Sequence, residues 1–497
     1  MKEESNKSLK AQVVFGLVWR FGERIIVQLI AFCVQIVLAR ILMPEDFGVV
    51  ALVTVFVSIS TNLAENGFGN ALIQKADADE LDYSSVFYFG IFAYIGLYGL
   101  FFFAAPYIAA FYENEILTPV LRVMGLRLVV AAFNLVQYAH VHRHLLFRKY
   151  FASTLIGTIV SAIIAFAMAY SGFGVWALVE QMLVSSFVNM LVLWVTVKWR
   201  PKKMFSWSRL KALLSYGWKL MFGSLLNTIY DEIRSLIIGR VYSPEALAYY
   251  SKGNSFPGTV TNNVTKTIES VLFPALSIKQ NSPDEVKNMT RRSIKISAYL
   301  TMPLMFGLVV VARPLILVLL TEKWLPCVPF LQVICVQHAL MPMQTANLQA
   351  IKALGRSDLF LKLQIIKKGV GFILLFASVP FGVLAIAISG AITSFLYSII
   401  NAYPNSKLLG YGYLSQLRDL ATPTLLAVGM AIGIFPIQYL PLAPIAVLVL
   451  QVLAGIVLYI LFSIIFKIES FQYLLKILKQ LLGQRLSKPA TNIKPES

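Results

Sequence analysis

The sequence has few charged residues for its length. Asp, Glu, Lys and Arg make up only 13% of the 497 residues, whereas 58% are hydrophobic, and the mean hydropathy is +0.72. These values lie well outside the range of soluble globular domains. The net charge of +19 is spread in short clusters between apolar runs. This pattern excludes a soluble nucleic-acid-binding domain and indicates topology signals that contact anionic lipid.

Cysteine, histidine and nucleotide-binding motifs are also scarce. The three cysteines and four histidines show no spacing typical of a metal site or a disulfide framework. A G-x-x-x-x-G-K-[ST] motif is absent, which argues against ATP hydrolysis. We therefore expect no metal site. The polar N-terminus leads into a first apolar segment too long and too charged for a cleavable signal peptide, so we expect it to be retained.

Apolar runs of about 20 residues dominate the chain, and a helix of that length crosses ~30 Å of hydrocarbon. The hydropathy pattern predicts an all-α polytopic membrane protein with fourteen transmembrane helices. The predicted spans are 14–39, 47–63, 83–103, 117–138, 151–171, 175–197, 214–239, 253–275, 296–318, 327–350, 359–379, 382–402, 420–439 and 443–466.

Lys and Arg are concentrated in alternate loops, among them 143–149, 198–211, 279–295 and 352–368. Short loops rich in Lys and Arg stay in the cytoplasm. The even number of spans then predicts a multi-pass membrane protein with both termini in the cytoplasm. The acidic segment 65–82 also falls on this side, but acidic residues have little weight in the rule.

Two motifs recur along the chain. LARILMPEDFG, which contains Arg40, recurs as IIGRVYSPEALAYY with Arg240, and GFGVWAL from Gly172 recurs as PFGVLAI from Pro380. Two six-helix copies inserted the same way up would form pseudo-symmetric lobes, an arrangement typical of transporters that work by alternating access. The predicted parts are an N-terminal lobe (1–200), a C-terminal lobe (201–410), two additional transmembrane helices (411–466) and a cytoplasmic basic tail (467–497).

Ionisable residues inside the predicted spans are the candidates for a site, because a charge at the bilayer centre costs at least ~2.5–3.5 kcal/mol. They are Arg20, Glu23, Arg24, Arg122, Arg127, Asp231, Arg234, Lys266, Glu269 and Arg313. Seven are cations and three are acids. A cavity with this surplus favours an anion, and a diphosphate suits Arg and Lys through charge-assisted hydrogen bonds.

We assign roles to these residues as predictions. The predicted substrate-binding cations are Arg24, Arg234 and Lys266, with Arg20 and Arg127 beside them. The predicted acids for H⁺ or Na⁺ coupling are Glu23, Asp231 and Glu269. An equally weighted alternative is that charges one turn apart neutralise each other, with Glu23 pairing with Arg20 or Arg24, Asp231 with Arg234 and Lys266 with Glu269.

Signals for enzymatic chemistry are weak. Asp77 and Asp79 form a D-x-D motif, which holds a divalent cation in many glycosyltransferases, but no nucleotide-binding fold follows, so a solvated acidic loop is favoured. The histidines 140, 142 and 144 are expected to face headgroups, and His338 is expected to be a hydrogen-bonded helix residue. A membrane glycosyltransferase or polymerase remains an alternative.

Several stretches together resemble a known family. They are LARILMPEDFGVVAL from Leu38, ENGFGNALIQ from Glu65, LLFRKY from Leu145, GFGVWALV from Gly172, VLFPALS from Val271 and TEKWLPCVPFLQ from Thr321. The chain resembles the polysaccharide transporters, or Wzx-type flippases, of the multidrug/oligosaccharidyl-lipid/polysaccharide exporter superfamily, and is most similar to the colanic acid exporter branch. Met43 and Thr321 depart from the glycines common in that family, and both affect only outer turns.

The resemblance implies a flippase that is not an enzyme. It would move undecaprenyl-diphosphate-linked oligosaccharide units, precursors of lipopolysaccharide, exopolysaccharide or capsule, to the periplasmic leaflet without an organic cofactor. It would work beside glycosyltransferases, a polymerase and a chain-length regulator. The rival within the superfamily is a cation-coupled multidrug exporter, which should present an anionic, aromatic cavity instead of a cationic surplus.

Overall fold

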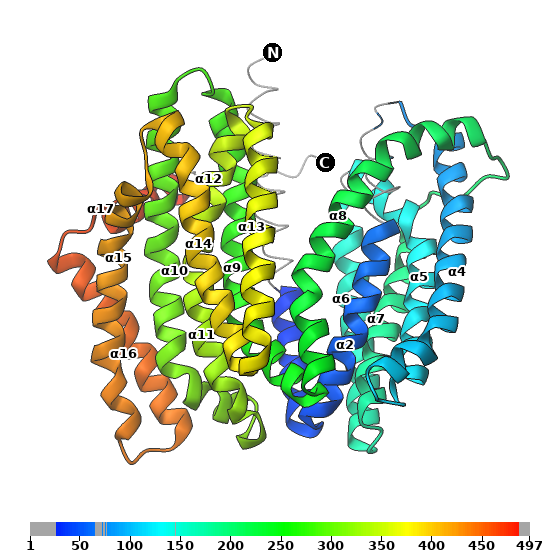
Figure 1. Cartoon of the computed structure of the whole chain (residues 1–497), viewed down its shortest axis with the longest axis horizontal. Coiled ribbons are helices and arrows are strands. Elements are labelled where there is room, and N and C mark those ends of the chain that lie inside the picture. Colours follow the sequence, from blue (N-terminus) through cyan, green and yellow to red (C-terminus); the bar gives the residue numbers. More distant parts are fainter. Residues whose placement is uncertain (1–25, 65–71, 73–74, 76, 145, 487–497) are drawn as a thin grey trace, which may run out of the picture. The chain divides into compact units, whose positions relative to one another are not determined.

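The computed structural model describes residues 26–64, 72, 75, 77–144 and 146–486. These residues form α-helices joined by short turns and 3₁₀ segments, with no strand among them (Figure 1). Ten helical segments of the described chain are long and apolar enough to cross a membrane. The protein is therefore a multi-pass membrane protein, which confirms the predicted all-α polytopic fold.

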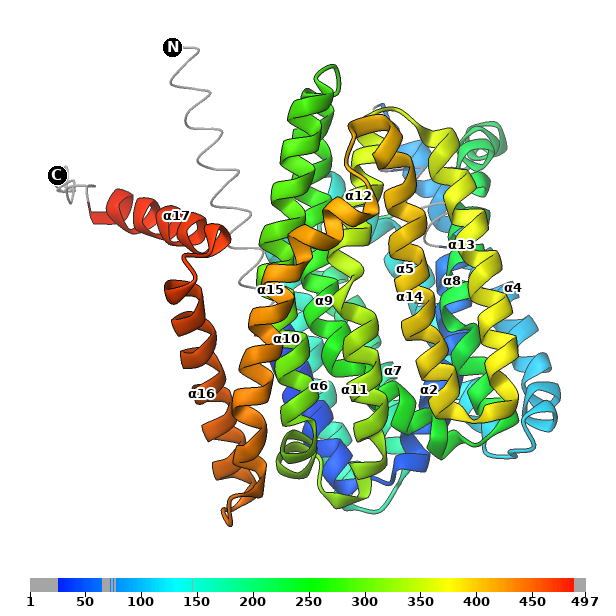
Figure 2. The same ribbon diagram turned by 60° about the vertical axis from the view of Figure 1, so that its left-hand side comes forward.

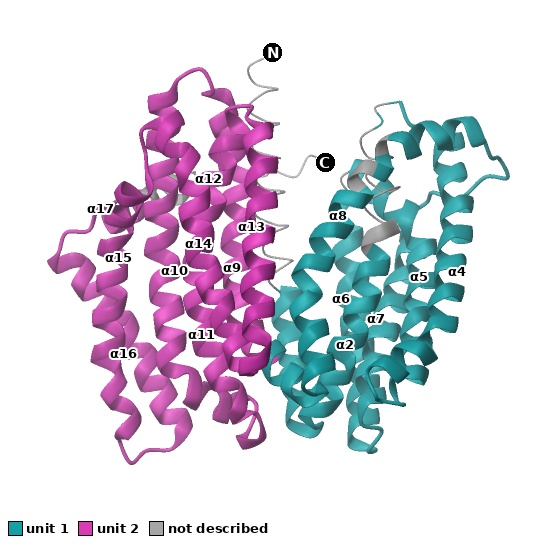
Figure 3. Ribbon diagram, viewed as in Figure 1, with its two compact units in different colours: residues 1–251 teal, residues 252–497 magenta. Residues whose placement is uncertain are grey.

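The chain divides into two compact units, one up to Ser251 and one from Lys252 onward (Figure 3). The helices of the first unit are Ile26–Ile41, α2 (Pro44–Ala64), α4 (Glu80–Phe111), α5 (Leu117–Arg143), α6 (Phe147–Tyr170), α7 (Val175–Thr196) and α8 (Trp207–Val241). The next helix, α9 (Pro244–Ile278), runs across the division between the units. The compact units thus divide one helix later than the sequence repeat, whose lobe boundary at residue 200 stays a prediction.

The second unit is built around the long helix α10 (Pro283–Leu319). The elements that follow it are η2 (Glu322–Cys327), α11 (Val328–Ala339), α12 (Met341–Ala353), α13 (Ser357–Ser378), η3 (Val379–Phe381), α14 (Val383–Leu409), α15 (Tyr413–Ile434), η4 (Phe435–Tyr439), α16 (Pro444–Ile465) and α17 (Glu469–Leu486). Helix α10 packs against α11, α12, α15 and α16. The last helix, α17, turns sharply away from the direction of α16 (Figure 2).

Each predicted span overlaps a described helix, and the first span is described only from Ile26 onward. Three of the other helices, α8, α9 and α13, are too polar to qualify as spans on composition. Polar residues lower their hydropathy, as expected where a helix lines a watery cavity instead of contacting lipid. The count of fourteen spans stays a prediction.

The recurring motifs fold alike at their turns. Gly174 begins α7 with φ +54°, and Gly382 begins α14 with φ +101°, so both positions use backbone that favours glycine. The other two recurring motifs, at the starts of α2 and α9, are in contact within the first unit. A Cβ on Gly48 would lie 1.7 Å from the carbonyl oxygen of Pro244, so only glycine lets the starts of α2 and α9 approach this closely.

Candidate functional site

Three of the predicted site residues, Arg20, Glu23 and Arg24, lie outside the described residues. Their assignment to substrate binding or ion coupling stays a prediction. The other predicted residues belong to helices of the two units, and the geometry of each unit can be examined by itself.

Arg234 lies in the final turns of α8 and is partly buried. Its Nε is buried and has no hydrogen-bond partner among the described residues. The ion pairs described in the first unit use Lys75, Arg209 and Arg240 as their cations, and none joins Arg234 to Asp231. The turn-spaced pair that the sequence offered as an alternative therefore does not form. A buried N–H without a partner is costly, so Arg234 is suited to an anionic ligand.

The two arginines of α5 are bound within their own unit. The Nε of Arg127 donates to Ser186 Oγ on α7 at 3.1 Å. The Nε of Arg122 donates to the carbonyl oxygen of Phe102 at 3.3 Å, and its guanidinium lies 4.2 Å from the centre of the Phe102 ring. Arg122 thus fastens α5 to α4. Arg127 is partly buried between α5 and α7, and its role in substrate binding stays a prediction.

Lys266 is exposed on α9 and forms no ion pair with Glu269, one turn later, within the described part of the chain. The carboxylate of Glu269 instead accepts a hydrogen bond from the Nε2 of Gln349, at 3.4 Å. Gln349 lies on α12 and is only 4% exposed. The structure therefore brings Glu269 and Gln349 together. The sequence analysis did not predict this contact because it considered only ionisable residues, and Gln349 is uncharged.

Helix α9 carries an exposed polar stripe within the predicted span 253–275. Its members are Thr259, Asn262, Lys266, Thr267, Glu269 and Ser270. In the sequence, uncharged polar residues spaced three and four positions apart could have predicted this polar face of the helix. Hydroxyls of the stripe donate to the preceding turn, as Thr267 Oγ1 does to the carbonyl oxygen of Asn263 at 2.8 Å, which leaves oxygen lone pairs as acceptors. Such a face suits water or a sugar-phosphate better than lipid tails.

The D-x-D motif has a structural role at one of its two positions. Asp79 caps the N-terminus of α4, with its Oδ1 accepting from the backbone N–H of Asp82 at 3.0 Å. This hydrogen bond, together with the nearby guanidinium of Arg209, lowers the pKa of Asp79. Asp77 is exposed, and no group of three or more His, Cys, Asp or Glu residues in the described chain could hold a metal ion. The capping role favours the non-metal interpretation of the motif.

The histidines take part in helix packing. His140 and His144 stack with their ring centres 4.1 Å apart, and the ring of His142 contacts that of Phe147 at 5.8 Å. A ring nitrogen of His338 lies 3.2 Å from Asn254 Oδ1, the kind of hydrogen-bonded helix histidine that the sequence suggested.

Two lysines that were not among the candidate site residues lie in helices beside aromatic rings. Lys252 is in α9, with its Nζ 5.2 Å from the centre of the Trp324 ring. Lys367 is in α13, only 7% exposed, with its Nζ 5.5 Å from the centre of the Tyr397 ring. Sequence position relative to a predicted span did not reveal this, because the aromatic partners come from distant segments.

Comparisons with known proteins agree with this architecture. A family model described as "Polysaccharide biosynthesis protein" matches residues 37–329. The "Succinoglycan biosynthesis transport protein ExoT" of Rhizobium meliloti (strain 1021) is 27% identical over 321 residues, 64% of this chain and 65% of its own length. This match covers slightly less than two thirds of that relative. The "Lipopolysaccharide biosynthesis protein WzxC" of Escherichia coli (strain K12) is 23% identical over 434 residues, 85% of this chain and 86% of its own.

A solved structure shares the fold. The "Lipid II flippase MurJ, inward closed conformation" has a TM-score of 0.74 at 15% identity and covers 90% of this chain and 98% of its own. These findings confirm the resemblance read from the sequence motifs. Since the family match extends over more than half of the residues, the chain belongs to the polysaccharide biosynthesis protein family.

Proposed function

We propose that this protein is a flippase that moves undecaprenyl-diphosphate-linked oligosaccharide units across a bacterial inner membrane by alternating access. The family and its relatives, a succinoglycan transport protein and a lipopolysaccharide biosynthesis protein, support a polysaccharide precursor as the substrate. The fold shared with a lipid II flippase supports a lipid-linked one. In this proposal the protein is not an enzyme, has no organic cofactor, and has both termini in the cytoplasm.

The observation that carries the proposal is the polar stripe of α9 with Lys266 at its centre. A cation and several hydroxyl and amide groups are exposed on a helix within a predicted span. Lys266 would bind the diphosphate, and its neighbours Thr259, Asn262 and Ser270 would accept or donate hydrogen bonds to sugar hydroxyls. Arg234, whose buried Nε lacks a partner among the described residues, would contribute a second charged contact.

Transport in this proposal is driven by an ion gradient. Glu23, Asp231 and Glu269 are the candidate carboxylates that would bind H⁺ or Na⁺ in one state and release it in the other. The hydrogen bond from Gln349 Nε2 would position the Glu269 carboxylate for the ion. A glycosyltransferase, a polymerase and a chain-length regulator would supply and use the substrate.

The experiment is complementation of a flippase-null strain at matched membrane levels, with lipid-linked units assayed in each leaflet. Arg24→Gln, Arg234→Gln and Lys266→Gln should each lower export about tenfold or more, because each removes a charge-assisted contact to the diphosphate. Lys266→Arg should retain export because it keeps the charge.

The matched control is Arg356→Gln, which removes an exposed guanidinium paired with Asp358 at the start of α13. It should leave export unchanged. If lipid-linked units reach the periplasmic leaflet equally well without the protein, the flippase proposal fails and the glycosyltransferase or polymerase alternative comes forward.

A further inference from the structure

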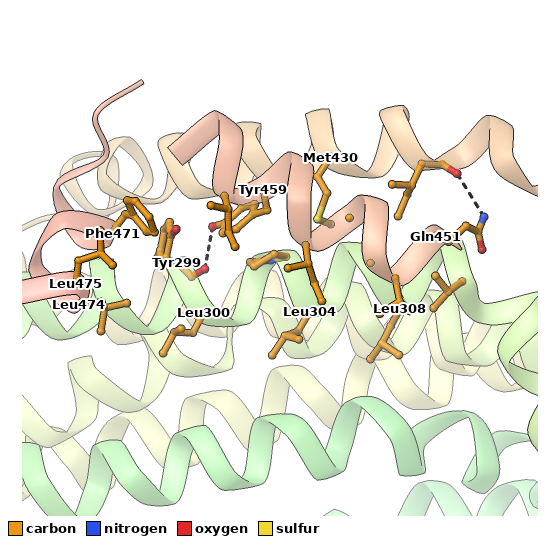
Figure 4. A pocket seen from close by; sticks show the side chains of 18 residues that line it. Tyr299, Leu300, Leu304, Leu308, Met430, Gln451, Tyr459, Phe471, Leu474 and Leu475 are labelled. Atoms are coloured by element: carbon orange, nitrogen blue, oxygen red, sulfur yellow. Dashed lines mark hydrogen bonds between the residues drawn. The ribbon is translucent and has the colours of Figure 1, made fainter. Parts of the chain in front are cut away.

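An apolar cavity of about 700 Å³ lies in the second unit between α10, α15, α16 and α17. Its volume is within the range of small-molecule and cofactor sites. Figure 4 shows Leu300, Leu304 and Leu308 of α10 along one side and Met430 and Tyr459 on the other. A lining of this kind fits a hydrocarbon chain.

At one end of the cavity, hydrogen bonds join α10 to α16, and α17 covers the opening. The hydroxyl of Tyr459 donates to the carbonyl oxygen of Tyr299 at 2.8 Å, and the Tyr299 hydroxyl lies 2.7 Å from Ser463 Oγ. Phe471 of α17 packs against Tyr299 with ring centres 6.5 Å apart. Apolar residues of α17 line the cavity, while Lys476 and Lys479 are exposed on the same helix. An amphipathic helix of this composition lies in the membrane interface.

A basic pocket adjoins this closed end. It has a volume of about 420 Å³ and is lined by Arg291, Arg292, Lys295 and Tyr473, among others. A smaller pocket of about 260 Å³ shares Lys295 with the basic pocket and Tyr299 with the apolar cavity, so the three lie next to one another. The residues around the two polar pockets include five cations and two acids. The cations are Arg291, Arg292, Lys295, Arg418 and Lys467, and the acids are Asp419 and Glu469.

The two acids do not neutralise this pocket. Asp419 receives both Nε and Nη2 of Arg291 at 2.7 Å each. Lys295 Nζ lies 2.9 Å from a carboxylate oxygen of Glu469 and 3.8 Å from one of Asp419. The Glu469 side chain is 75% exposed, so water weakens the shorter of these pairs. Arg292 lies over the ring of Tyr473 at 4.7 Å and forms no ion pair within the described part of the chain. Arg292 is thus the cation of the pocket most open to an anion.

We propose that the second unit binds an anionic phospholipid at the meeting point of α10, α15 and α17, with the headgroup phosphate on Arg292 and Lys295 and an acyl chain in the apolar cavity. The charge of the pocket selects the lipid, because the ammonium of a zwitterionic headgroup would meet surplus cations. Basic pockets between helices on the cytoplasmic side of membrane proteins recognise such headgroups. The ordinary membrane lipid is the occupant because α17 places the pocket at the interface, where phospholipids are always present.

The test is native mass spectrometry of the full chain purified in detergent with phosphatidylglycerol or phosphatidylethanolamine. The wild type should retain phosphatidylglycerol preferentially. Arg292→Gln with Lys295→Gln should reduce that preference about tenfold, since two charge-assisted contacts are lost. Gly307→Leu should lower retention of both lipids, because a Cβ on Gly307 would lie 3.6 Å from Met430 Cε and the longer leucine side chain would fill the cavity.

Arg356→Gln is the control, since it removes an exposed guanidinium of the same unit outside the pocket. Arg292→Gln alone guards against misfolding, because Arg292 is exposed and its loss breaks no ion pair of the described chain. Equal retention of phosphatidylglycerol by the wild type and the double variant would overturn the proposal. So would displacement of phosphatidylglycerol by undecaprenyl diphosphate, which would make the transported lipid the occupant. Binding is measured without transport, so the result is independent of the proposed function.

Discussion

Two carboxylates near the ends of membrane helices are held in ion pairs, whereas two cations within the predicted spans join no ion pair of the described chain. At the start of α4, the buried carboxylate of Asp82 accepts from Lys75 Nζ at 2.7 Å and lies 3.4 Å from Arg209. At the start of α15, Asp419 holds Arg291 in a bidentate pair. Arg234 and Lys266, inside the predicted spans 214–239 and 253–275, join no ion pair of the described chain.

If stability alone decided, the charges inside the spans would be paired first. An unpaired charge costs most where hydrocarbon surrounds it and least at the interface. Helix ends here carry the ion pairs and caps that fix the fold, and the span interiors keep polar groups available. In the proposed function, this contrast is expected because the interior cations would contact the anionic substrate.

The largest effect should come from breaking the paired end of α4. Asp82→Ala removes a fully buried carboxylate and leaves Lys75 and Arg209 without their shared partner, which should lower the free energy of unfolding by about 4 kcal/mol. Thermal unfolding of the purified protein in detergent measures this. Asp77→Ala is the control from the same loop, and because Asp77 is exposed it should change stability by less than about 0.5 kcal/mol.

The next largest effect should come from the contact between the recurring motifs. Gly48→Ala would drive a Cβ into the carbonyl oxygen of Pro244, and a backbone carbonyl cannot turn aside as a flexible side chain can. We expect a loss of about 3 kcal/mol in unfolding free energy, seen in the same thermal assay. Gly96→Ala is the matched control, because a Cβ there meets no atom within 4 Å and should stabilise α4 by about 0.5–1 kcal/mol. Equal stability of the two variants would mean that the two starts are not in close contact.

The smallest effect on stability should come from the unpaired cation. Lys266→Met removes a charge that has no ion-pair partner in the described chain, so we expect the unfolding free energy to stay within about 1 kcal/mol of the wild type. Export should nevertheless fall strongly. A destabilisation comparable to that of Asp82→Ala would mean that Lys266 stabilises the fold, and the contrast between the two groups of charges would not hold.

Substitution of Gln349, which donates a hydrogen bond to Glu269, tests whether this polar contact inside a span serves transport more than stability. Gln349→Leu removes the hydrogen bond that positions the Glu269 carboxylate, so we expect export to fall while the unfolding free energy stays within about 1 kcal/mol of the wild type. Export from membrane vesicles and thermal unfolding in detergent measure the two effects. Unchanged export in this variant would mean that the contact between Gln349 and Glu269 has no part in transport.

The sequence predicted the helices well because hydropathy is a local property. Each predicted span overlaps a described helix, although α4 runs from Glu80 to Phe111 where the span was 83–103. Helices continue past the hydrocarbon into the headgroup layer, which a hydropathy window does not register. The sequence also showed the recurring turn motif in which the structure gives both Gly174 and Gly382 a positive φ.

Pairing of charges could not be predicted in the same way. Spacing along one helix suggested Asp231 with Arg234 and Lys266 with Glu269, but such pairs contribute only about 0.2–0.5 kcal/mol. The pairs that do form join distant segments, such as Arg209 with Asp82 over 127 residues and Arg291 with Asp419 over 128. The same distance hid the hydrogen bond between Gln349 and Glu269.

The sequence by itself determined that this is an all-helical membrane protein, where its helices lie along the chain, and the family to which it belongs. Each of these follows from residues close together in the chain. Only the tertiary structure decided that Asp79 caps a helix, that Lys266 is exposed without an ion-pair partner in the described chain, and that the pocket of Arg292 lies beside an apolar cavity. Those outcomes depend on which helices pack together, because a charge or a cavity is defined by neighbours that local hydropathy does not specify.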